Sequence, residues 1–218
     1  MGHKPTNKKR MVEVKRPVYD FPLDDFSIFG KVSDEDLKLN STYALHTALC
    51  YIPPESIWDP VQDIRQEIDK GMERWPPHVN LLFPFIPETC FDSALKLLTQ
   101  ELQDFKPFEC SFDSISYFEK GSSVLWVNQN ETARNNFIEL QKRVASLFPY
   151  CAKKKNETGE FIPHMTVGYA PKTIVEKVHK QLSEDWKTQT VTVGEICMIY
   201  RPDVDTCFKI IHKVPLGK

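Results

Sequence analysis

The sequence lacks any long apolar run. Every uninterrupted apolar stretch is far shorter than the roughly 18 residues that indicate a membrane-spanning helix. The N-terminus is basic and polar, unlike a secretory signal peptide. We therefore expect no membrane partner and a cytoplasmic location, with Lys8, Lys9 and Arg10 leaving nuclear import as an alternative.

An excess of either charge is also missing. The 28 Lys and Arg residues nearly balance the 30 Asp and Glu residues, which gives a formal net charge of -2. No global basic field is present to attract long nucleic acids, so any contact with nucleic acid must be local.

Close cysteine pairs are a third absence. None of the six cysteines forms a C-x-x-C pair typical of metal sites. In a chain of this kind we expect them to be reduced and mostly buried. They are Cys50, Cys90, Cys110, Cys151, Cys197 and Cys207.

The apolar content suffices for one globular domain, because 41% of the 218 residues are hydrophobic. We expect residues 1–39 to form a weakly ordered lead-in and residues 40–218 to form the domain. The basic start of the lead-in suits a solvated tail or an arm that touches RNA. Its aromatic residues offer a third possibility, packing back onto the domain.

The segment 161–169, Phe-Ile-Pro-His-Met-Thr-Val-Gly-Tyr, carries the strongest functional signal. It is rich in β-branched and aromatic residues and predicts a strand. His164 and Thr166 are two residues apart, so their side chains leave the same face of that strand. An imidazole and a hydroxyl side by side suit the binding of an anion and the transfer of a proton.

A similar pair lies upstream, where Pro76-Pro77 leads into an apolar run that begins with His78 and Asn80. Histidine can give or take a proton near neutral pH, because its unperturbed pKa is about 6.5. Two histidines on opposite sides of one phosphate can therefore cleave a phosphodiester without a metal. Asn80 and Thr166 could donate hydrogen bonds to the phosphate oxygens.

The order of the predicted elements repeats along the chain. Each half gives a helix, a motif strand, a second helix and paired strands, and the motif histidines are 86 residues apart. The predicted helices begin at Asp59-Pro60, near Phe91, near Ala133, and at Thr173 with a capping box to Glu176. The predicted strands are 43–52, 78–85, 108–118, 123–128, the second motif strand, 190–200 and 207–214.

This layout predicts an α+β fold of two similar lobes, built from antiparallel sheets with helices on the outside. The two motif strands then face each other across a central cleft. Nothing in the sequence indicates a coiled coil or an obligate interface, so we expect a monomer.

His164-Met165-Thr166 and His78-Val79-Asn80 resemble the paired H-x-[ST] motifs of the 2H phosphoesterase superfamily. The similarity is greatest to the RNA 2′,3′-cyclic phosphodiesterases, also called 2′-5′ RNA ligase-like proteins. It covers about residues 41 to 215, and the element order agrees with the two-lobed fold of that family.

The resemblance implies roles for the motif residues. His78 would protonate the leaving 3′ oxygen, and His164 would activate water. The phosphate-binding role passes to Thr166 directly and to Asn80 in part, because the family has Thr or Ser there. A carboxamide can also donate a hydrogen bond, but its reach differs.

Three further residues are candidates for substrate binding. Tyr200 and Arg201 end a strand that the family places beside the cleft, and Trp126 lies on another strand. An aromatic ring there could stack on a nucleobase, and Arg201 could hold phosphate. Ordinary packing is the alternative for each. Lys153, Lys154 and Lys155 could guide an RNA end or simply be solvated.

The resemblance implies hydrolysis of 2′,3′-cyclic phosphate ends of RNA, or of small cyclic nucleotides, to 2′-phosphates, with no cofactor and no metal. Two alternatives remain, a 2′-5′ oligonucleotide phosphodiesterase and a nucleotide- or RNA-binding module with weak turnover. A zinc site would need three or four close ligands, and neither motif has a nearby carboxylate or cysteine. We expect His46, His179 and His212 to be structural.

Overall fold

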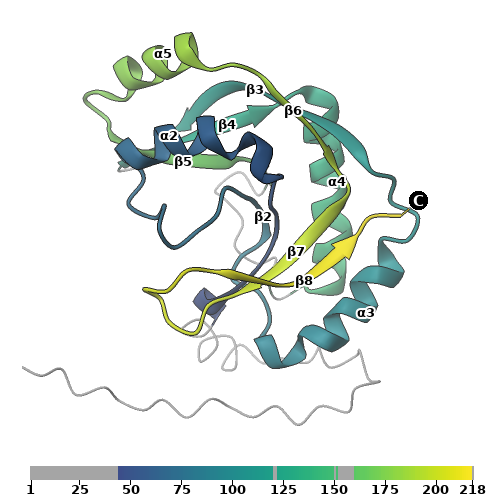
Figure 1. Ribbon diagram of the computed structural model, residues 1–218. Helices are drawn as coiled ribbons and strands as arrows, with labels where there is room; N and C mark the ends of the chain where they lie inside the picture. The colour runs from purple at the N-terminus through teal and green to yellow at the C-terminus, as the bar shows by residue number, and fades with distance from the viewer. Residues whose placement is uncertain (1–43, 120–121, 150, 152–159, 218) are drawn as a thin grey trace, which may run out of the picture.

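The computed structural model describes residues 44–119, 122–149, 151 and 160–217 (Figure 1). The predicted lead-in, the turn at Lys120-Gly121 and the run Lys153–Lys155 lie outside these residues. The expected domain boundary at residue 40 therefore stays a prediction.

Two antiparallel sheets of four strands each form the two lobes. The two-lobed α+β prediction is confirmed. The first sheet has the order β2 (Val79–Leu82), β1 (Thr47–Tyr51), β7 (Glu195–Tyr200), β8 (Lys209–Pro215). The second sheet has the order β5 (Met165–Pro171), β4 (Ser122–Gln129), β3 (Phe108–Phe118), β6 (Gln189–Val193).

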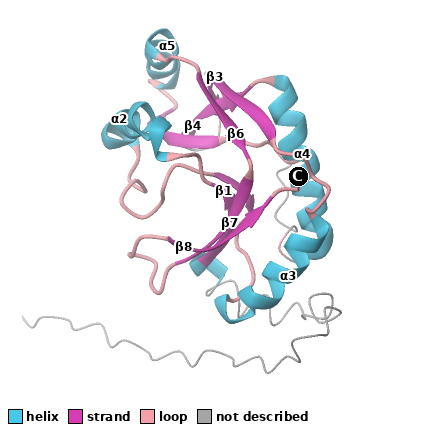
Figure 2. Ribbon diagram, turned by 45° about the vertical axis from the view of Figure 1, so that its right-hand side comes forward, coloured by secondary structure: helices cyan, strands magenta, loops and turns pink. Residues whose placement is uncertain are grey.

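In the described part of the chain, four α-helices cover the sheets from outside (Figure 2). They are α2 (Trp58–Ile68), α3 (Phe91–Glu101), α4 (Glu131–Leu147) and α5 (Val175–Asp185). Helix α3 packs on β8 and α5 packs on β3. The other two cross between lobes, because α2 packs on β5 and α4 contacts both β2 and β3. Among the described residues there are also three 3-10 turns, η2 (Ala44–His46), η3 (Glu55–Ile57) and η4 (Glu88–Cys90).

The repeated unit differs from the one that the element order predicts. β1 pairs with the motif strand β2, and β4 pairs in the same antiparallel way with the motif strand β5. The two units are therefore β1-α2-β2-α3 and β4-α4-β5-α5, and the second begins at β4 rather than at α4. Strands from distant parts of the chain, β7 and β8, complete the first sheet.

Several predicted boundaries and caps are wrong. The first strand begins at Thr47, because the preceding residues form a 3-10 turn. Helix α2 begins at Trp58 without a side-chain cap, so Asp59 is not its N-cap. The Trp58 indole instead donates to the Pro53 carbonyl at 2.9 Å. The Thr173–Glu176 capping box is absent, because α5 begins after Ile174 with no side-chain cap. The strand predicted over 190–200 is two strands that meet at Gly194.

One large buried cluster spans both sheets and the inner faces of α3 and α4. The apolar helix faces read from the sequence supply much of it, including Phe91, Leu98, Phe137 and Leu140. Burying such side chains is the main favourable term in folding, at about 1.5–3 kcal/mol each. All six cysteines are free, and four of them are buried, as expected.

A smaller cluster lies beside the motif residue Asn80 in the first sheet. It contains Cys50, which is the register neighbour of both Asn80 and Cys197. Trp75 and Phe83, which line the cavity between the lobes, pack against this cluster. The apolar side chains of this cluster therefore support the cavity wall that Trp75 and Phe83 form.

Candidate active site

The two motif histidines occupy equivalent places, each immediately before its strand. His78 precedes β2 and His164 precedes β5, and these two strands lie in contact. Each ring is anchored in the same way. Nδ1 of His78 lies 2.7 Å from the Pro76 carbonyl oxygen, and Nδ1 of His164 lies 2.7 Å from the Ile162 carbonyl oxygen.

These anchors fix the tautomer of both rings. A carbonyl oxygen can only accept a hydrogen bond, so each Nδ1 must carry the proton and donate it. In a neutral imidazole the other nitrogen then has the lone pair. Both Nε2 atoms are therefore the nitrogens available for proton transfer. The proline or isoleucine two residues upstream sets this arrangement through its backbone alone.

Asn80 lies directly against the reactive nitrogen of His78. Its Nδ2 is 3.0 Å from His78 Nε2. Because Nε2 of the neutral ring is an acceptor, the Asn80 amide donates to it. The Asn80 Oδ1 is buried and has no hydrogen-bond partner among the described residues. The Thr166 hydroxyl, on the opposite lobe, also lines the cavity.

Burial lowers the pKa of both histidines. The pKa of His78 falls to about 4, chiefly because burial disfavours the charged ring, and the charges of Arg65 and His164 lower it further. The Pro76 carbonyl and Asp69 oppose this change. Burial also lowers the pKa of His164. The hydrogen bond to the Ile162 carbonyl has the opposite, smaller effect. Both rings are therefore neutral at pH 7.

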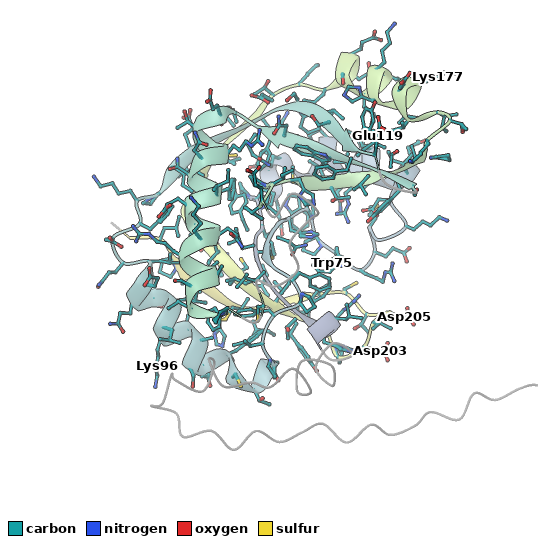
Figure 3. The ribbon with its side chains drawn as sticks, turned by 180° about the vertical axis from the view of Figure 1, so that it is seen from behind. Trp75, Lys96, Glu119, Lys177, Asp203 and Asp205 are labelled. Carbon is teal, nitrogen blue, oxygen red and sulfur yellow. The ribbon has the colours of Figure 1, made fainter. Side chains whose placement is uncertain are left out.

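Aromatic side chains hold both rings in place. The indole of Trp75 stacks on His78, with ring centroids 4.5 Å apart and planes 18° from parallel (Trp75 is labelled in Figure 3). His164 meets Phe118 edge-on at 5.2 Å and Trp126 at 6.0 Å. These contacts restrict the rotation of both imidazoles and exclude water from one side of each.

The loop between α2 and β2 is tied to the helix by a buried ion pair. Arg65 is 2% exposed and its Nε donates to Asp69 Oδ2 at 2.7 Å. Its Nη2 donates to the Trp75 carbonyl at 2.9 Å, and the Gly71 amide donates to Asp69 Oδ1 at 2.7 Å. Arg65 thus connects α2 to the residue that stacks on His78.

Gly168 allows β5 to approach the end of α2. A Cβ atom at this position would lie 2.4 Å from the Ile68 side chain and 2.9 Å from its carbonyl oxygen. The φ of +156° is also one that L side chains rarely adopt. The glycine two residues after Thr166 therefore sets the distance between the motif strand and α2.

The motif residues line one cavity of about 1000 Å³ between the lobes. Lys70 and Arg74, from the segment between α2 and β2, also line it, as does Glu119, which follows β3. In Figure 3 Glu119 and Trp75 are labelled on different lobes. The volume is at the upper end of the range for small-ligand sites. The arrangement can bind an anion and move protons on both sides of it.

The three predicted substrate-binding residues do not line this cavity. Trp126 is 6% exposed and stacks on Phe118, which does line it. Arg201 is also 6% exposed, and it donates to the carbonyls of Leu45 and Val204 at 3.0 and 2.6 Å. Tyr200 is half-buried and packs against the main core.

Arg201 and its neighbours support the cavity from behind. The Arg201 guanidinium lies over the rings of Phe208 and Trp75, at 4.5 and 5.8 Å. Phe208 and Trp75 have ring centroids 4.0 Å apart, and the Phe208 amide donates to the Arg74 carbonyl at 2.9 Å. The β7–β8 loop therefore positions Trp75.

The other three histidines of the described residues make structural contacts, as predicted. His46 bonds the Arg201 carbonyl, His179 bonds the Ile115 carbonyl, and His212 lies 3.2 Å from Asp92. Within the described part of the chain, no three His, Cys, Asp or Glu side chains come together as metal ligands. In that part of the chain, no third zinc ligand accompanies the two motif histidines.

Sequence reasoning missed four residues of this site, namely Arg65, Asp69, Trp75 and Tyr169. An arginine and an aspartate four residues apart near a helix end are usually an exposed pair. Trp75 stands just before Pro76-Pro77-His78 in the sequence, and that proximity was the one available signal for it. Only the tertiary structure brings Arg65 and Asp69 to the same cavity wall.

A family model described as the 2'-5' RNA ligase superfamily matches residues 53–205, which include both motifs. The chain belongs to this superfamily. No curated protein matches the chain by sequence.

Solved structures share the fold of this superfamily member. LigT from E. coli in complex with 3'-AMP matches with a TM-score of 0.54 at 15% identity, over 79% of this chain and 98% of that one. Its apo form matches with a TM-score of 0.55 at the same identity and coverage. TT0787 of Thermus thermophilus matches with a TM-score of 0.52 at 15% identity, over 79% and 99% of the two chains.

Superfamily membership supports a phosphoesterase-type function. The described residues contain no helix that is both long and apolar enough to span a membrane.

Proposed function

We propose that the protein hydrolyses 2′,3′-cyclic phosphate ends of RNA, or small cyclic nucleotides, to 2′-phosphates without a metal. The observation that carries this proposal is the matched pair of histidines. Both rings donate from Nδ1 to a carbonyl two residues upstream, and both line the same cavity. Such a pair supplies one base and one acid on either side of a phosphate.

In the proposed reaction, Nε2 of His164 takes a proton from water as the water oxygen bonds to phosphorus. The bond from phosphorus to the 3′ oxygen breaks, and His78 gives that oxygen a proton from its Nε2. The products are a 2′-phosphate and a 3′-hydroxyl. His164 then releases its proton to solvent and His78 takes one up, which restores both rings.

Asn80 and Thr166 hold the non-bridging oxygens in this proposal. The Asn80 amide donates to His78 Nε2 in this structure. When phosphate enters, that N–H turns to a phosphate oxygen, which leaves Nε2 to carry a proton. The Thr166 hydroxyl donates from the other lobe. Hydrogen bonds that strengthen as charge develops on oxygen lower the barrier.

A substrate panel tests the proposal directly. The protein is incubated with 2′,3′-cyclic nucleotides and with 2′-5′ and 3′-5′ dinucleotides, and the position of the product phosphate is identified. A 2′-phosphate from the cyclic substrate is the expected result, because it requires departure of the 3′ oxygen. Cleavage of the 2′-5′ dinucleotide alone would replace the proposal with a 2′-5′ phosphodiesterase.

His78→Ala and His164→Ala should each reduce kcat by at least about 100-fold, because each removes one proton-transfer group. The measurement is turnover of the cyclic substrate, with circular dichroism to show that both variants fold. EDTA should leave the rate unchanged. His212→Ala is the control, because this histidine lies on β8, pairs with Asp92 of α3 and does not line the cavity. Near-wild-type rates in both motif variants would rule the mechanism out.

A binding module is the second candidate, and the state of His78 favours it. The Asn80 amide occupies the reactive nitrogen, and burial lowers the pKa of the ring to about 4. Both features disfavour protonation of His78 at Nε2. Calorimetric binding of nucleotides, together with no hydrolysis of any substrate in the panel, would establish this function. The 3'-AMP in the E. coli LigT structure supports a nucleotide ligand in either case.

A further inference from the structure

Strand β8 forms an edge of the first sheet. Among the described residues its one strand partner is β7, and the two run side by side in Figure 1. The Leu216 amide donates to the Gly194 carbonyl opposite it at 2.9 Å. Bonded pairs alternate along an antiparallel ladder, so Lys213, an odd number of residues away, turns its amide and carbonyl to the outer edge. This edge therefore offers backbone hydrogen bonds to a further strand.

Aliphatic side chains of β8 are exposed beside this edge. Ile210 is 44% exposed and Ile211 is 39% exposed, whereas the aliphatic side chains of the other strands in the sheet are buried. A bulge separates the two isoleucines. Met198 pairs with His212 and Ile199 pairs with Ile210, so Ile211 has no residue opposite it. Adjacent exposed isoleucines on the edge of a sheet are typical of a site that pairs with another segment.

The charges of β8 disfavour a second copy of the same strand as that segment. Lys209 and Lys213 flank the isoleucines. In an antiparallel pair of two β8 strands centred on Ile211, each Lys209 would lie opposite a Lys213, and like charges directly opposite destabilise a pair. Lys213 already pairs with Glu195 of β7 at 2.7 Å, and Lys209 adds a further positive charge at the other end of the strand. An acidic segment suits this edge better.

The N-terminal lead-in contains such a segment at residues 24–29, Asp-Asp-Phe-Ser-Ile-Phe. These residues lie in the part of the chain that the structure does not describe. Phenylalanine and isoleucine favour strands, and no proline interrupts the run. Phe26 and Ile28 are two residues apart, so both would leave the same face of a strand. Asp24 and Asp25 carry the charge opposite to that of Lys209.

The lead-in joins the domain beside the β7–β8 hairpin. The described chain starts at Ala44 in η2, and Arg201 directly follows β7. The Arg201 amide donates to the His46 carbonyl at 2.9 Å, and its Nε donates to the Leu45 carbonyl at 3.0 Å. Residues 30–43 can span roughly 45 Å when extended. A domain of ~175 residues has a radius of gyration of about 16 Å, so the acidic segment can reach β8.

We propose that residues 24–29 dock along the outer edge of β8 as an additional strand. Phe26 and Ile28 cover the exposed isoleucines, and the two aspartates balance the lysine charge of the edge. Main-chain hydrogen bonds supply affinity and the alternate side chains supply specificity, as in other cases of strand addition. This docking is independent of the catalytic proposal, because no residue of β8 lines the cavity.

Hydrogen exchange on the full chain, resolved by NMR, tests this docking. In the wild type the amides of residues 24–29 should exchange at least about tenfold more slowly than in an unstructured peptide. Phe26→Asp should abolish that protection and speed exchange at Lys213, whereas Phe26→Leu should keep both. Ile210→Asp should have the same effect from the other partner. Ile174→Asp is the matched control, because Ile174 is 47% exposed just before α5.

Each outcome decides for or against the docking. Protection of residues 24–29 that is independent of protein concentration and is lost in both Phe26→Asp and Ile210→Asp supports it. Unstructured exchange rates for residues 24–29 in the wild type overturn it. Protection that survives Ile210→Asp also overturns it, because the segment would then dock elsewhere. Protection at Lys213 that rises with protein concentration, together with a dimer in sedimentation, overturns it in favour of a second copy.

Discussion

A histidine that gives a proton must first carry one, and the surroundings of His78 oppose its protonation. Asn80 donates to its Nε2, and burial together with Arg65 and His164 lowers the pKa of the ring to about 4. An anion in the cavity reverses both effects. It offers the Asn80 amide another acceptor, and its charge favours the imidazolium. In the proposed reaction the substrate therefore brings about the protonation of its own acid.

Anion binding should consequently be accompanied by proton uptake. Sulfate is a suitable probe, because it does not titrate near neutral pH. At about pH 6.5, the unperturbed pKa of histidine, its binding should be accompanied by measurable proton uptake. Isothermal titration in two buffers of different ionisation enthalpy measures this uptake.

The charged groups that act on His78 are Arg65 on α2, Asp69 just after α2, and His164 beside β5. Bound sulfate also favours the charged form of His164, whose pKa burial lowers, so His78→Gln should lower the uptake without necessarily abolishing it. Sulfate binding with no proton uptake in the wild type would contradict the protonation of His78 by bound anion.

At the scale of elements, the α2–β2 loop is the part that the site depends on. Arg65 connects α2 to Asp69 and to the Trp75 carbonyl, and Trp75 stacks on His78. Three donors of Arg65 are already engaged within the protein, including one bond to Gln62. Its 2% exposure further indicates that Arg65 positions the loop rather than binding substrate.

Arg65→Met should destabilise the protein by about 3–5 kcal/mol, because Asp69 would remain buried without its partner. The double variant Arg65→Met/Asp69→Asn removes that charge and should recover part of the loss. Both variants should still hydrolyse substrate more slowly, since Trp75 loses its tie to α2. Urea denaturation and kcat/KM measure the two effects.

Arg143→Met is the comparison for this variant. Arg143 pairs with Asp104 on the surface at 2.7 Å, and such pairs contribute about 0–1 kcal/mol. A loss in Arg65→Met as small as the loss in Arg143→Met would show that the buried pair does not hold the loop.

At the scale of the whole molecule, the cavity exists only when both lobes are assembled. Its walls come from both sheets, α2 packs on β5 of the opposite sheet, and α4 contacts β2. The same burial that shapes the site therefore links it to global stability. Two neutral histidines enclosed between lobes make the folded state sensitive to acid.

The free energy of unfolding should decrease as the pH falls from about 6.5 to about 4. Below about pH 6.5 the unfolded chain binds a proton at residue 78, whereas the folded protein does so only near pH 4. The unfolded state then binds more protons, so acid favours it. The loss attributable to His78 is at most about 3 kcal/mol.

Urea denaturation at several pH values measures this dependence, and His78→Gln should flatten part of it. Above about pH 6.5 both states are neutral at this position, so the contribution of His78 should be constant there. An equally steep decrease in His78→Gln would assign the acid sensitivity to other groups.

The sequence by itself determined the local features that depend on neighbouring residues. The spacing of His164 and Thr166, and of His78 and Asn80, placed each pair on one strand face, because side chains alternate along a strand. The apolar faces of α3 and α4 were also readable, since helical periodicity reports burial directly. These patterns were enough to predict the two-lobed fold and the superfamily.

Only the tertiary structure decided the features that join distant segments. The pairing of β4 with β5, and of β1 with β7, depends on contacts between sequence-distant strands, which no local pattern specifies. The bulge in β5 also arises from that pairing, because Leu125 pairs with Gly168 and Trp126 with Thr166. Packing likewise buries the ion pair of Arg65 and Asp69, which holds the α2–β2 loop. It also buries Trp126 and Arg201 outside the lining of the cavity. The chemistry of the site was local in sequence, whereas its shape and proton affinities come from packing.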